Sequence, residues 1–156
     1  MNLIRWISDH LVASPPAKPN SRMKISNLTR AVALAHCVEV ADHGATRRKG
    51  LLGRASLPTG EGLWIVPCES VHTFGMKFPI DLVYLDRNKE VKKVRSRVPP
   101  WRLSACFSAY SVVELAAGTI EKTQTRPGDK LEFSTSATPN GNTDSLAPQP
   151  RCTKSR

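Results

Sequence analysis

The sequence predicts an α+β fold that is mainly β: a compact antiparallel or mixed sheet, curled or barrel-like, with one or two short helices. Three observations indicate this class. Several apolar segments have the length of strands, clusters of Gly, Pro, Asn and Asp separate them, and a single segment favours a helix. The 156 residues are 40% hydrophobic and 23% charged, as in one ordinary globular domain. No apolar stretch approaches the roughly eighteen residues that a membrane-spanning helix requires.

The first half of the domain predicts a strand region, a helix and a second strand. Residues 25–40 alternate apolar and polar side chains, which is typical of a hairpin or a long bent strand. After a turn at 42–44, residues 45–54 favour a short basic helix, which Pro58 and the residues after it break. Residues 62–66 predict a buried strand.

The second half predicts an irregular loop over residues 67–79, followed by strands with turns between them. These predicted strands are 80–86, an antiparallel return at 90–98, an inner strand at 112–117 that Gly118 ends, and a short last strand at 130–133.

Composition divides the chain into three parts. Residues 1–22 predict an extension with a Pro-rich linker, and the sequence leaves the choice between Met1 and Met23 as the start open. Residues 23–134 predict a single globular domain. Residues 135–156 are mostly small and polar, with Leu146 as the one large aliphatic residue, and therefore predict a disordered tail.

The chain is basic, with 23 Lys and Arg against 13 Asp and Glu and a net charge of +10. This charge is spread along the sequence, and its best cluster lies mostly at strand spacing, which favours a solvated strand face: Lys92, Lys93, Arg95, Arg97 and Arg102. Binding to nucleic acid is therefore disfavoured. The four cysteines form no C-x-x-C pair, so we expect neither a metal nor another cofactor.

Cys68 and His72 are the candidate catalytic residues, because a thiol, a carboxylate and an imidazole within five residues can form a nucleophile with its base. In an extended segment, however, the two side chains stand about 13 Å apart, at roughly 3.3 Å per residue. The sequence therefore favours a buried cysteine and a hydrogen-bonded histidine that line a loop, unless a turn brings them together.

Four other residues are candidates for ligand binding together with His72. Arg47 and Arg54 are two helical turns apart, so they share one helix face and can clamp an anion or pair with carboxylates. Trp101 and Arg102 follow a Pro-rich connection and suit a carboxylate, phosphate or peptide, although a tryptophan that caps the end of the sheet is the alternative.

Asp81 is the remaining ligand-binding candidate. It lies in a strand that is apolar on both faces, so we expect its carboxylate to be buried with a cation or with several N–H donors. The expected partners are Arg54 or Arg47 from the basic helix, or His72 from the adjoining loop.

Several motifs together resemble those of one bacterial and archaeal family: Arg47-x-x-Gly50-Leu51-Leu52-Gly53-Arg54, Gly62-Leu63, Phe74-Gly75-Met76-Lys77, Pro79 to Asp86, Pro100-Trp101-Arg102, Val113-Glu114-Leu115-x-x-Gly118 and Gly128-Asp129. On these motifs the chain resembles the domain-of-unknown-function 192 family. Many members have Met-Leu-Phe where this chain has Leu63-Trp64-Ile65, a change within apolar types. The resemblance implies a compact β-rich domain and no established chemistry. Some members carry secretion signals, which keeps a cell-envelope location open beside the cytoplasmic one that we expect.

The sequence therefore predicts a small, non-enzymatic ligand- or partner-binding domain whose partner is a small molecule, peptide or protein. We expect a groove with the strand that begins at Ile80 as its floor and Arg54, His72, Trp101 and Arg102 at its rim. The alternatives are a Cys/His-dependent hydrolase or transferase and a basic nucleic-acid-binding protein.

Overall fold

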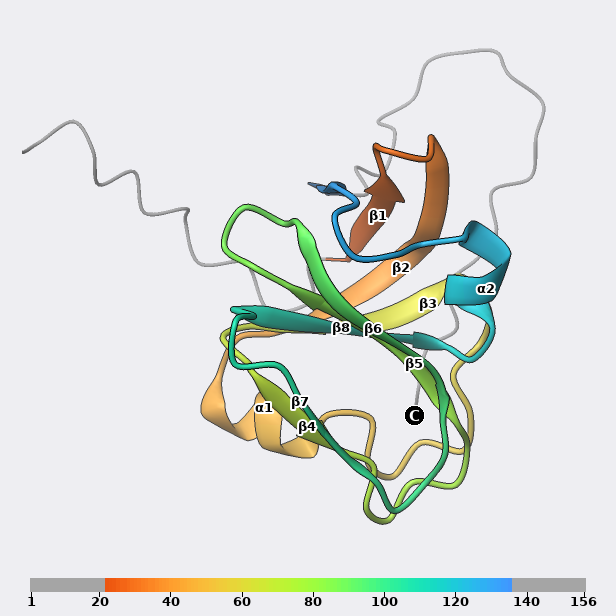
Figure 1. Cartoon of the computed structure of the whole chain (residues 1–156). Helices are drawn as coiled ribbons and strands as arrows, with labels where there is room; N and C mark the ends of the chain where they lie inside the picture. Colours follow the sequence, from red (N-terminus) through yellow and green to blue (C-terminus); the bar gives the residue numbers. More distant parts are fainter. Residues whose placement is uncertain (1–21, 136–156) are drawn as a thin grey trace, which may run out of the picture.

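A seven-stranded mixed sheet dominates the computed structural model, which describes residues 22–135 (Figure 1). Its strand order is β6-β5-β8-β3-β2-β1-β9, and a separate two-stranded ribbon pairs β4 with β7. The predicted mainly β, curled mixed sheet with two short helices is confirmed. The predicted N-terminal extension and C-terminal tail lie outside the described residues, apart from Arg22 and Thr135.

The first strands form a hairpin followed by a crossover. β1 (Met23–Asn27) pairs antiparallel with β2 (Val32–Ala41). Of the two structures predicted for residues 25–40, the chain therefore forms the hairpin and not the long bent strand. β2 then runs parallel to β3 (Glu61–Ile65), and two parallel neighbours require a connection that crosses over. Helix α1 (Gly44–Lys49) lies in this connection and is shorter than the predicted 45–54, because the chain leaves the helix at Gly50 with a φ of +50°.

The centre of the sheet is buried on both faces. β5 (Ile80–Leu85) pairs antiparallel with β6 (Val91–Val98) and with β8 (Ser111–Ala116), and all residues of β5 and β8 are buried. Their alternating side chains enter two apolar clusters, one that includes Leu82 and Tyr84 and one that includes Val83 and Leu85. The hairpin predicted over residues 80–98 is confirmed. β9 (Leu131–Thr135) pairs with β1 at the far edge of the sheet.

Three short elements were not predicted: β4 (Ser70–His72), β7 (Leu103–Ala105) and α2 (Thr119–Thr123). β4 and β7 have three residues each, too few for a periodic pattern, and each exists because the other supplies its hydrogen-bond partner from 30 or so residues away. The ribbon and α1 lie on the same side of the sheet, at the bottom of the view in Figure 1. They enclose the space described below. No helix among residues 22–135 is long and apolar enough to cross a membrane.

Asp81 holds two turns of backbone at the end of the sheet. It is 0% exposed, and its carboxylate oxygens accept hydrogen bonds from the backbone N–H groups of Arg97 (2.7 Å) and Ile120 (2.8 Å). Arg97 lies at the irregular register between β5 and β6 with a φ of +49°, and Ile120 lies in the first turn of α2. The expectation of a buried carboxylate with N–H donors is confirmed. The expected arginine or histidine partners are wrong, because β5 brings Asp81 to the backbone of β6 and α2 and not to α1.

Candidate functional site

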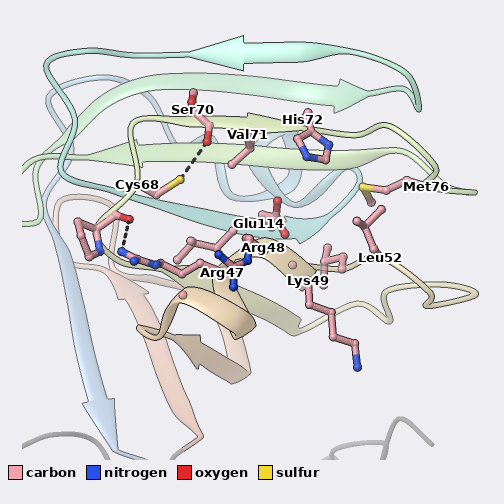
Figure 2. Close-up of a pocket in the computed structure, with 15 residues that line it drawn as sticks. Arg47, Arg48, Lys49, Leu52, Cys68, Ser70, Val71, His72, Met76 and Glu114 are labelled. Carbon is pink, nitrogen blue, oxygen red and sulfur yellow. Dashed lines mark hydrogen bonds between the residues drawn. The ribbon is translucent and has the colours of Figure 1, made fainter.

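A pocket of about 510 Å³ lies between α1 on one side and the start of β4 on the other. Its size is within the range of small-molecule sites. Figure 2 shows Cys68 and His72 on the β4 side and Arg47, Arg48 and Lys49 on the α1 side. Glu114 of β8 lies between these two walls and, with Ile65 of β3, belongs to the central sheet beneath them. We call this space the α1–β4 pocket. Its floor is β8 and β3 and not the predicted strand, β5.

Glu114 is the most unusual residue of the pocket. It is 3% exposed, and its Oε2 has no hydrogen-bond partner among the residues that the structure describes. Burial raises the pKa of Glu114 to about 7, and the Arg54 guanidinium opposes this only in part. Near neutral pH the carboxyl group is therefore about half protonated, so it can donate a hydrogen bond as well as accept one.

The last turn of α1 supplies the positive charge of the pocket through Arg47, Arg48 and Lys49. Arg47 Nη1 donates a hydrogen bond to the Pro67 carbonyl oxygen (3.3 Å), which ties the helix to the segment before β4. No acidic residue lies in the first turn of α1, and Glu114 is the only carboxylate among the lining residues of the described chain. The pocket therefore presents three cations on its α1 wall and one recessed carboxyl group in its floor.

Cys68 and His72 line the same pocket, which the irregular loop predicted for this segment did not imply. The Cys68 thiol donates a hydrogen bond to the Ser70 carbonyl oxygen (3.1 Å), and burial raises the pKa of the thiol. The His72 ring stacks on Phe74, with ring centroids 5.2 Å apart. The thiol and the imidazole thus interact with different groups. This arrangement is more typical of two residues that line a loop than of a nucleophile with its base.

Arg54 and Asp81, two of the predicted site residues, lie outside the pocket. Arg54 Nη2 forms an ion pair with Glu39 Oε2 (2.8 Å) beside a second hollow that Thr46 and Lys49 also line. Arg47 and Arg54 therefore do not share a helix face, because α1 ends at Lys49. Asp81 is occupied by the two backbone donors described above.

Trp101 and Arg102 flank the ribbon beyond the pocket. Trp101 is 65% exposed, so it does not cap the end of the sheet, and its ring lies 6.0 Å from that of Phe74. Arg102 is exposed and donates from Nη1 to the carbonyl oxygen of Trp101 (3.1 Å). His72, Phe74 and Trp101 form a continuous line of rings, which we call the aromatic row. Of the predicted residues, the structure brings Arg47, Cys68 and His72 together and leaves Trp101 at the far end of this row.

Sequence reasoning did not select Glu114, although the signal was present. A single carboxylate in the otherwise apolar segment 112–117 meets the same criterion that selected Asp81. The structure separates the two residues by their partners, since Asp81 has two N–H donors and Glu114 Oε2 has none within residues 22–135.

Most cations of β6 already have partners. Lys92 Nζ pairs with Asp86 and Glu90, Lys93 Nζ donates to the Ala105 carbonyl oxygen (2.7 Å), and Arg97 pairs with Glu121. Within residues 22–135, no group of three or more His, Cys, Asp or Glu side chains is arranged to hold a metal ion.

The comparisons with known proteins agree with this architecture. The profile of the DUF192 family, described as "Uncharacterized ACR, COG1430", matches residues 26–133. The UPF0127 protein PF1050 of Pyrococcus furiosus is 32% identical over 113 residues, which cover 69% of this chain and 95% of that protein.

Two crystal structures share the fold. A putative transcription regulator from Sinorhizobium meliloti 1021 matches with a TM-score of 0.64 and 21% identity, over 72% of this chain and 92% of that one. A protein of unknown function from Novosphingobium aromaticivorans matches with a TM-score of 0.62 and 20% identity, over 71% and 83%. The two structures show the shared fold, whereas the family profile and the Pyrococcus relative show the family: the chain belongs to the domain-of-unknown-function 192 family.

Proposed function

We propose that this protein is a non-enzymatic binding module whose α1–β4 pocket takes a small carboxylate or phosphate group. The observation that carries this proposal is the carboxyl group of Glu114, which is 3% exposed, lacks a partner for Oε2 among the described residues, and has a pKa of about 7. A buried polar atom without a partner destabilises a fold. A ligand that accepts a hydrogen bond would supply that partner.

The charges around Glu114 indicate the sign of the ligand. Arg47, Arg48 and Lys49 favour an anion at the mouth of the pocket. An anion close to Glu114 favours the protonated carboxyl group, which then donates a hydrogen bond to the ligand oxygen. Binding is therefore linked to proton uptake by Glu114.

The alternative of a Cys/His-dependent enzyme has less support. A nucleophilic cysteine needs a lowered pKa and a base within hydrogen-bond distance. Burial instead raises the pKa of Cys68, and its thiol donates to the Ser70 carbonyl oxygen. The nucleic-acid alternative is weakened by the ion pairs and hydrogen bonds that occupy Lys92, Lys93 and Arg97.

Titration of the full chain with acetate, succinate and inorganic phosphate, followed by the amide chemical shifts in NMR, tests the proposal. At least one anion should shift residues 47–52, 68–72 and 114 together. If the bound state requires a protonated Glu114, affinity at pH 6 should exceed that at pH 8 by about tenfold, given a pKa of about 7.

Two variants and a matched control make the test specific. Glu114→Gln keeps a hydrogen-bond donor without a titrating group, so it should bind at both pH values, whereas Glu114→Leu should lose binding. Glu121→Gln changes an exposed carboxylate of α2 and should leave the pH dependence intact. Absence of shifts around the pocket with all three anions would contradict the proposal.

A cytoplasmic location, with the cell envelope as the alternative, is a separate proposal from the sequence, and cell fractionation tests it.

A further inference from the structure

The outer face of the β4–β7 ribbon carries large apolar side chains in the open. Phe74 is 45% exposed, Trp101 is 65% exposed and Leu103 is 67% exposed. Leu103 lies directly opposite His72 in the strand register, so it extends the aromatic row across the ribbon. A contiguous exposed patch of this kind marks an interaction site more often than scattered apolar residues do.

The aromatic row is held in place by a buried threonine. Thr73 is 1% exposed and connects the two loops at the end of the ribbon: its N–H donates to the Arg102 carbonyl oxygen (2.9 Å), and its Oγ1 donates to the Pro99 carbonyl oxygen (2.8 Å). The Trp101 N–H donates back to the Thr73 carbonyl oxygen (3.0 Å). The backbone that carries Phe74 and Trp101 is therefore fixed before any partner arrives, which reduces the entropy lost on binding.

Trp101 adopts an unfavourable backbone conformation without gaining burial. Its φ is +63°, a left-handed conformation that is rare and unfavourable for a bulky residue. A tryptophan that is 65% exposed contributes little to the core in return. This conformation places the ring at the end of the row, 6.0 Å from Phe74.

The row and the α1–β4 pocket are one continuous surface, because His72 belongs to both. The centroid distances of 5.2 Å and 6.0 Å limit the row to about 11 Å at most, the length of roughly three extended residues at 3.3 Å each. Segments 70–78 and 99–108, which form the ribbon and its loops, contain Lys77 and Arg102 and no carboxylate; Glu69 lies at the opposite end of β4 from the aromatic row. The complementary partner is therefore acidic, apolar and extended.

We infer that this surface binds an extended peptide segment. A carboxylate of the peptide, from Asp, Glu or a free C-terminus, enters the pocket beside Glu114, and two or three apolar side chains lie along the aromatic row. This inference rests on the proposed function, since it uses the same pocket. An anionic bilayer would contact the exposed rings but not a carboxyl group that is 3% exposed, so the recessed pocket favours a peptide.

Affinity selection of a synthetic random octapeptide library on the immobilised full chain, read by mass spectrometry, tests this inference. Half of the library carries a free C-terminal carboxylate and half a C-terminal amide, which distinguishes a terminal carboxylate from acidic side chains. The wild-type chain should enrich peptides in which a carboxylate adjoins two or three apolar residues. Trp101→Ser, and independently Leu103→Ser, should lower the affinity of the enriched peptides by at least about tenfold.

Leu28→Ser is the matched control, because Leu28 is 53% exposed in the turn between β1 and β2, away from the ribbon. It should leave the enrichment unchanged. Enrichment that Trp101→Ser does not alter, or no enrichment while the small anions still bind the pocket, would overturn the peptide inference and leave the proposed function standing. If the wild-type chain binds neither the peptides nor the small anions, both the peptide inference and the proposed function are overturned. Sedimentation with phosphatidylglycerol and phosphatidylcholine vesicles that depends on Trp101, without peptide enrichment, would assign the row to a membrane surface and also overturn the inference.

Discussion

Replacement of Glu114 by glutamine should stabilise the protein at alkaline pH. The folded-state pKa of about 7 lies above the ordinary value of 4.5, so the folded chain holds a proton that the unfolded chain has lost between these pH values. Stability therefore falls as the pH rises from 4.5 to 7. The pKa difference corresponds to roughly 3 kcal/mol, because each pKa unit is worth about 1.4 kcal/mol. Above pH 7 this destabilisation is complete, and below pH 4.5 it is absent.

Urea unfolding of the wild type and of Glu114→Gln at a series of pH values measures this contribution. Their free energies of unfolding should be similar near pH 4 and should diverge until the variant is more stable by roughly 3 kcal/mol at pH 8. The difference between the two free energies of unfolding at each pH removes the contribution of all other titrating groups, because both proteins share them. A variant that is less stable than the wild type at pH 8, or a difference that does not change with pH, would refute the reasoning, since Glu114 would then have a favourable partner in the folded state.

Three further predictions follow from the other buried groups. Asp81→Asn should lower the free energy of unfolding by about 2–4 kcal/mol, because Arg97 and Ile120 donate to different carboxylate oxygens and the amide replaces one of these oxygens by an NH2 donor. Urea midpoints should show additivity with Arg54→Gln, and non-additive losses would support the predicted contact between Asp81 and Arg54. Cys68 should react with iodoacetamide at neutral pH more slowly than an unfolded cysteine, since burial raises its pKa, and selective fast labelling that Cys68→Ser removes would support the thiol-enzyme alternative. The chain without residues 1–22 and 135–156 should still unfold in one cooperative thermal transition, because both apolar clusters of the described chain lie within residues 23–134, and a broad non-cooperative transition would contradict this.

The central strands could be predicted because the apolar pattern of their own sequence matches their burial in the sheet. Residues 80–98 contain an apolar run, a turn and an alternating return, which is a local description of β5 and β6. The ribbon could not be predicted in the same way. β4 and β7 are three residues long, and each exists through hydrogen bonds to a segment that is distant in sequence.

The candidate site shows the same limit. The sequence identified Arg47, Cys68 and His72 as residues with chemistry, and the structure places them in one pocket. The sequence could not show that the chain leaves the helix before Arg54. Because it does, Arg54 forms an ion pair with Glu39 outside the pocket. For Asp81 the sequence could show that a carboxylate is buried but not which donors meet it, because the Arg97 and Ile120 N–H groups come from β6 and α2. For Glu114 it could not show that Oε2 has no hydrogen-bond partner among the described residues.

The measurement that tests the central claim most directly is an NMR titration of the Glu114 side-chain carboxyl carbon, with and without the anion that binds the pocket. The pocket that we describe predicts a titration midpoint near pH 7 in the free protein, and a higher midpoint when the anion is bound, because the bound charge favours the protonated carboxyl group. A midpoint near 4.5, or a midpoint that the anion leaves unchanged, would contradict Glu114 as the proton-bearing floor of a binding site.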